Sequence, residues 1–173
     1  MSECKPLDPT AFGLFFVALL SLPVALLCFG IYMGDAKMAA IPAQGLLNVC
    51  AFFILIAAIG AYRAGSNFGF IVFGMVAAGV YLTVNYGGPY VDLTLALMFI
   101  LALVWSYRVH NLKLLTMILV TTALVFLFGG LSGLVDGDMV DIMVLLKGVA
   151  ALGNFVLSLY LAFALADENL PCY

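Results

Sequence analysis

The chain has 173 residues, of which 66% are hydrophobic and 9% are charged, and its mean hydropathy is +1.25. Soluble domains carry roughly 25% charged residues, so this composition cannot cover a surface that faces water. The formal net charge of −3 provides no basic surface of the kind that binds nucleic acid. The sequence therefore predicts an integral membrane protein, with residues 1–173 forming a single domain that contacts the lipid bilayer.

Six apolar runs are long enough to cross the hydrocarbon layer, which takes about 20 residues in a helix. In chain order they are Ala11–Tyr32, Ile41–Tyr62, Phe68–Tyr86, Tyr90–Tyr107, Leu112–Ser132 and Met139–Ala166. They do not alternate as barrel strands do, and each is much longer than the roughly 10 residues of such a strand. Short connections rich in Gly, Pro and Asn separate the runs, which predicts an all-α bundle of three consecutive hairpins.

The basic residues of the connections indicate the orientation. One side of the predicted bundle carries most of them, namely Lys5, Arg63, Arg108 and Lys113. The positive-inside rule then places both termini in the cytoplasm of a cell with this protein in its inner (plasma) membrane. The opposite side collects carboxylates, namely Asp35, Asp92, Asp136, Asp138 and Asp141.

Residues for catalysis or for a metal are scarce. The single histidine, His110, lies in a predicted loop without a clustered thiol or carboxylate, and the four cysteines show no CxxC spacing. We therefore expect no catalytic residues, no metal site and no cofactor, and we do not expect an enzyme.

Polar residues inside the apolar runs are more informative, because a polar group that faces lipid costs free energy. Most are Ser and Thr, for which hydrogen bonding between helices is a sufficient explanation. The amides Asn48 and Asn154 fit either helix packing or the wall of a solute path. Lys147 lies several residues inside the last run, where it either reaches the interface or a carboxylate among Asp136–Asp141, or attracts an anion at an outer mouth.

A bundle of this size leaves room only for a narrow path with an apolar constriction. Such a path suits a small solute: a short carboxylic acid, its anion or a neutral amide. A neutral solute crosses an apolar constriction at lower cost than a bare anion, because desolvating a charge is expensive. The alternative is a structural membrane protein without a path, since packing alone also explains the small and hydroxyl-bearing residues.

Two motifs carry a resemblance to a known family. Asp8-Pro9-Thr10-Ala11-Phe12-Gly13-Leu14 resembles the Asn-Pro-Ala-Pro-Leu-Gly-Leu signature of the acetate/succinate transporter family. The segment Tyr62–Gly69 is similar to that family's Tyr-Lys-x-Gly-Asn-Thr-Phe-Gly between helices two and three. A urea/amide channel group with six helices is an alternative of similar architecture.

The resemblance implies a homo-hexameric ring in which each protomer holds a narrow pore for acetate or similar monocarboxylates. It implies solute contacts near the N-terminal motif, at Asp8, Pro9, Thr10, Phe12, Gly13 and Leu14. Its constriction would fall near Phe16 or Val17, Val76 and Val120. Two positions differ from the family pattern in ways that concern the solute. Asp8 replaces the family's Asn, and it either caps the first helix or contacts solute. Val76 replaces a Tyr.

Overall fold

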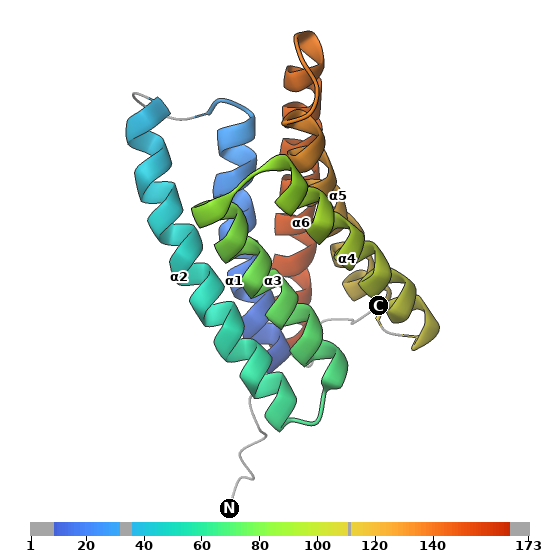
Figure 1. Cartoon of the computed structure of the whole chain (residues 1–173). Coiled ribbons are helices and arrows are strands. Elements are labelled where there is room, and N and C mark those ends of the chain that lie inside the picture. Colours follow the sequence, from blue (N-terminus) through green and yellow to red (C-terminus); the bar gives the residue numbers. More distant parts are fainter. Residues whose placement is uncertain (1–8, 32–35, 111, 167–173) are drawn as a thin grey trace, which may run out of the picture.

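A computed structural model describes residues 9–31, 36–110 and 112–166, and in 36–43 it describes the backbone only. These residues form six α-helices, shown in Figure 1: α1 Pro9–Cys28, α2 Ala36–Arg63, α3 Asn67–Tyr86, α4 Pro89–Arg108, α5 Lys113–Ser132 and α6 Asp138–Ala166. Each helix is long and apolar enough to cross a membrane. The prediction of six apolar spanning helices is confirmed, and the ends of α3 to α6 lie within one residue of those predicted.

Helix α1 ends at Cys28, earlier than the predicted Tyr32, because a glycine turn stops it. Gly30 has a φ of 67°, a left-handed conformation that glycine adopts without a steric cost. The N–H groups of Gly30 and Ile31 donate to the carbonyls of Leu27 and Leu26. These two bonds form a Schellman motif, which satisfies the last carbonyls of the helix. The apolar run continues through this turn, so hydropathy alone predicts a helix that is too long at its C-terminal end.

The family-like segment Tyr62–Gly69 is the turn between α2 and α3. Gly65 has a φ of 79°, and the Ser66 N–H donates to the Ala61 carbonyl in the same kind of motif. Ser66 then caps α3, since its Oγ accepts a hydrogen bond of 3.1 Å from the Gly69 N–H. The motif thus encodes a sharp reversal between two helices.

The bundle has two halves, with α1, α2 and α3 on one side of Figure 1 and α4, α5 and α6 on the other. Helix α1 packs extensively on α6 and thereby joins the halves, whereas α3 and α4 make the slightest contact of any consecutive pair. Six alternating helices bring the start of α1 and the end of α6 to the same end of the bundle (Figure 1).

The core and the surface of this bundle are both apolar. The fully buried side chains include Leu14, Ile54, Phe99, Leu119 and Leu161. Large apolar side chains such as Phe52 and Phe163 are exposed on the outside, as expected of a surface that faces lipid. Because lipid is as apolar as the core, close packing and hydrogen bonds between helices hold such a bundle together.

Candidate solute pathway

A cavity of about 250 Å³ lies where all six helices meet. Each helix contributes side chains to its lining, for example Leu20, Leu47, Val80, Asp92, Phe126 and Lys147. A single water needs roughly 10–15 Å³ of such space, so the cavity has room for a small solute with some of its water. We call it the charged cavity, because an acidic and a basic side chain line it among apolar neighbours.

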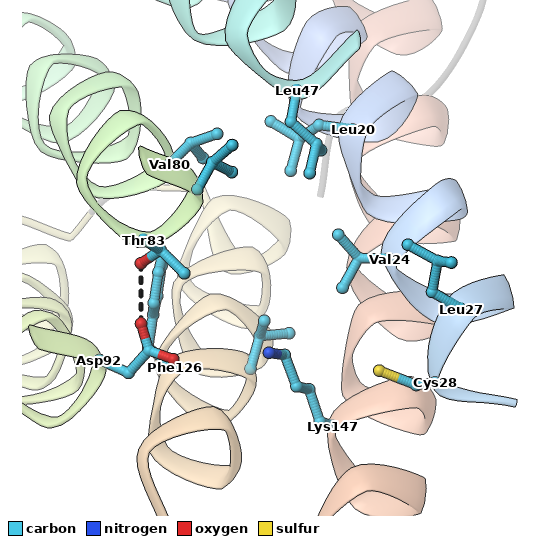
Figure 2. A pocket seen from close by; sticks show the side chains of 12 residues that line it. Leu20, Val24, Leu27, Cys28, Leu47, Val80, Thr83, Asp92, Phe126 and Lys147 are labelled. Atoms are coloured by element: carbon cyan, nitrogen blue, oxygen red, sulfur yellow. Dashed lines mark hydrogen bonds between the residues drawn. The ribbon is translucent and has the colours of Figure 1, made fainter. Parts of the chain in front are cut away.

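The two charged side chains face each other in Figure 2. Asp92 lies in the first turn of α4, where the positive end of the helix dipole stabilises a carboxylate. Its Oδ1 accepts a hydrogen bond of 2.7 Å from the Thr83 hydroxyl of α3. Lys147 of α6 extends its ammonium into the cavity from the other side.

Gly129 of α5 makes this approach possible. A Cβ on Gly129 would stand 2.8 Å from Asp92 Oδ2 and 3.1 Å from Lys147 Nζ. Both charged atoms therefore lie beside the same bare stretch of backbone, and any side chain there would push one of them away. Asp92 is 7% exposed, so this carboxylate is withdrawn from solvent.

A second, smaller cavity of about 40 Å³ lies deeper, among α1, α3, α5 and α6. We call it the central cavity. Its polar lining centres on Asn154, which is 4% exposed. The amide nitrogen donates to Ser21 Oγ at 3.2 Å, and Oδ1 accepts from Thr121 Oγ1 at 3.1 Å and from Ser158 Oγ at 3.4 Å. The amide thus links α1, α5 and α6 through one polar cluster.

The two cavities adjoin along a ring of apolar side chains, which we call the collar. It consists of the residues that line both cavities: Leu20, Val24, Val80, Val125 and Phe126. Phe126 is held in place by a parallel stack on the buried ring of Phe99, with centroids 5.4 Å apart. The described residues thus form, in series, a cavity with two charged side chains, an apolar collar and a small, largely apolar central cavity with the Asn154 amide in its wall.

Two of the predicted constriction residues line the central cavity: Val17, which is 3% exposed, and Val76, which is 6% exposed. Phe16 instead stacks on Phe53 of α2, with centroids 4.6 Å apart, and is absent from the linings of both cavities. Val120 is 38% exposed and is likewise absent from both linings, where α5 contributes Val125 and Phe126 instead.

The two amides predicted as packing or path residues differ in their surroundings. Asn154 lines the central cavity and also links helices, as described above. Asn48 exchanges hydrogen bonds with Asn85, the shorter of them 2.8 Å, and so joins α2 to α3. It lies on a separate groove between these two helices, away from both cavities.

In the part of the N-terminal motif that the structure describes, the residues pack α1 against neighbouring helices. Asp8 lies outside the described residues, so its role as cap or solute contact stays a prediction. Pro9 packs against Gly60 of α2, and Gly13 packs against Phe73 and Ala57. Leu14 is 1% exposed, whereas Phe12 is 38% exposed and makes an edge contact with Phe16. Thr10, half-buried, completes the motif.

Asp92 and the collar were not singled out by sequence reasoning. The carboxylate that faces Lys147 is Asp92, whereas Asp136, Asp138 and Asp141 are exposed. A signal for Asp92 did exist, since it is the third residue of the apolar run Tyr90–Tyr107 and an ionisable residue inside such a run indicates function. The collar had no such signal, because its side chains resemble those that face lipid. Among the described residues, no group of three His, Cys, Asp or Glu side chains gathers as a metal site would require.

Comparisons with known proteins place the fold. The sequence matches no protein-family model and no curated protein. A solved structure, described as that of the bacterial acetate channel SatP, superimposes with a TM-score of 0.80 over 98% of this chain and 100% of that one, at 14% sequence identity. The likeness agrees with the resemblance carried by the two motifs. The chain is thus a multi-pass membrane protein with the fold of the bacterial acetate channel SatP.

Proposed function

We propose that this chain is a membrane channel or transporter that passes small monocarboxylates, such as acetate, through a path within each protomer. The observation that carries the proposal is the series of charged cavity, collar and central cavity, which runs from one end of the bundle to its middle. The fold shared with an acetate channel supports the same class of solute.

The collar acts as the selective barrier. A hydrated ion must lose water among apolar side chains that offer no replacement, and this loss is costly. A short carboxylic acid has an apolar methyl end that suits the collar and a polar end that needs partners on either side. Lys147 and Thr83 supply them in the charged cavity, and the Asn154 cluster supplies them in the central one.

A urea or short-amide channel is the second candidate. The same hydroxyl and amide groups bind an amide as readily as a carboxylic acid, since both solutes carry a donor and an acceptor. We further propose that both termini face the cytoplasm, that the protein resides in the inner (plasma) membrane and that it assembles as a hexamer, on the basis of the basic residues and the family resemblance.

Uptake of labelled acetate into proteoliposomes tests the proposal. We expect flux well above that of protein-free liposomes. Val76→Phe should reduce it to near that background, because the larger ring fills the small central cavity that Val76 lines. Val156→Phe is the matched control, since Val156 is 56% exposed on the outside of α6.

Two results would contradict the proposal. Wild-type acetate flux at the protein-free background, together with strong uptake of urea or formamide, would favour the amide channel. Background flux for every solute would favour a structural protein.

A further inference from the structure

The two charged side chains of the charged cavity affect whether it admits a solute as an anion or as a neutral molecule. A carboxylate from α4 and an ammonium from α6 approach the same glycine, Gly129 of α5, from two sides. The Thr83 hydroxyl occupies one carboxylate oxygen, so that Asp92 Oδ2 remains as an acceptor facing Lys147. The Cys28 thiol is the other titratable group on the lining.

The two opposite charges make the lining electrically neutral as a whole. A bare anion that enters leaves a net negative charge among apolar walls, because Lys147 is already offset by Asp92. An uncompensated charge in such surroundings is strongly disfavoured. A neutral solute adds no charge, and it can donate a hydrogen bond to Asp92 Oδ2 while it accepts one from Lys147 Nζ.

We propose that Asp92 and Lys147 form a selectivity site that binds neutral solutes carrying one donor and one acceptor, above all undissociated short-chain carboxylic acids, in preference to their anions. The inference rests on the proposed function and adds the form in which the solute is taken. It assigns Asp92 the role of cancelling the attraction that Lys147 alone would exert on anions. Gly129 lets the two groups share the space in which the solute binds.

A pair of probes with the same shape and different charge tests this site. Methanesulfonamide is neutral at working pH, with donor and acceptor groups, and methanesulfonate is an anion at every accessible pH. In proteoliposomes with the wild-type protein, we expect uptake of acetate and methanesulfonamide, with methanesulfonate near the protein-free background. This comparison needs no variant, so it does not depend on how a mutant folds.

Substitutions then assign the selectivity to the pair. Asp92→Asn leaves the Lys147 charge unopposed, so methanesulfonate uptake should rise by about tenfold or more relative to methanesulfonamide, the scale of one fixed charge facing another in a protein interior. The double variant Asp92→Asn with Lys147→Gln is neutral again and should restore the exclusion of methanesulfonate. Each variant is first checked for a single symmetric peak in size-exclusion chromatography.

The outcomes separate this inference from the proposed function. Acetate flux accompanied by equal methanesulfonate flux in the wild type would overturn the site while leaving the channel in place. An unchanged probe ratio in Asp92→Asn would also overturn it. Flux of no solute above background would contradict the proposed function instead.

Discussion

At the scale of single residues, Asn154 combines two roles that sequence reasoning left open. Its amide joins α1, α5 and α6, and the same side chain lines the central cavity. Two of the hydroxyls around it keep other acceptors, since Ser21 Oγ donates to the Val17 carbonyl at 2.7 Å and Thr121 Oγ1 to the Ile118 carbonyl at 2.9 Å. Loss of the amide is therefore partly compensated.

Asn154→Leu, which keeps the branching and the number of heavy atoms of the side chain, should accordingly lower the stability in detergent by only about 1 kcal/mol, the scale of hydrogen bonds between membrane helices. Thermal unfolding measures this change. Thr94→Val is the control, because Thr94 is exposed and its hydroxyl bonds to the Tyr90 carbonyl of its own helix. If acetate flux is lost while the unfolding temperature falls only slightly, the amide contacts solute. Unchanged flux would confine Asn154 to helix packing.

At the scale of elements, the position of α1 against α2 and α3 depends on the absence of a side chain at Gly13. A Cβ there would lie 2.7 Å from a ring carbon of Phe73 and 3.0 Å from the Ala57 Cβ. Phe73 is 3% exposed and has little room to move. Close contacts of this kind are how small residues bring membrane helices together.

Gly13→Ala should therefore destabilise the fold by about 1–3 kcal/mol, the usual cost of overpacking a tight interface. Gly45→Ala in α2 is the matched control, since a Cβ at Gly45 meets no described atom within 4 Å. Unfolding of both variants in the same detergent gives the comparison. Equal stabilities would mean that α1 shifts at no cost and that the contact does not position the helix.

At the scale of the whole molecule, the outside of the bundle carries a groove of about 360 Å³ between α2 and α3. Asn48, Phe52, Gly74 and Tyr81 are among its lining, and Phe52 is 60% exposed. The groove lies away from the proposed path. It is therefore a candidate contact surface for the hexamer that the family resemblance implies.

Native mass spectrometry in a mild detergent should give six copies of the chain. Gly74→Trp should shift the population to smaller species if the groove is a subunit contact. The protomer itself should tolerate this change, because a Cβ at Gly74 meets no described atom within 4 Å. Monomers in the wild type would contradict the hexamer, and an unaffected hexamer would place the contact elsewhere.

Some of the side chains that line the candidate pathway were within reach of sequence reasoning, and their role as a constriction stays a prediction. Val17 and Val76 were predicted from the ungapped extension of two motifs, and both line the central cavity. Five hydroxyl and amide residues expected to face other helices are buried, namely Ser21, Ser106, Thr122, Asn154 and Ser158. Their polarity distinguishes them from lipid-facing residues, and this is why the sequence located them.

Composition and length by themselves determined that this chain is a bundle of six membrane helices, because about 20 apolar residues span the hydrocarbon only as a helix. Only the tertiary structure decided which apolar side chains face inward. Val120 and Val125 are equally apolar, yet one is exposed and the other belongs to the collar. In lipid both faces of a helix are apolar, so hydropathy does not tell them apart. The facing of Asp92 and Lys147 likewise depends on how three helices pack around Gly129.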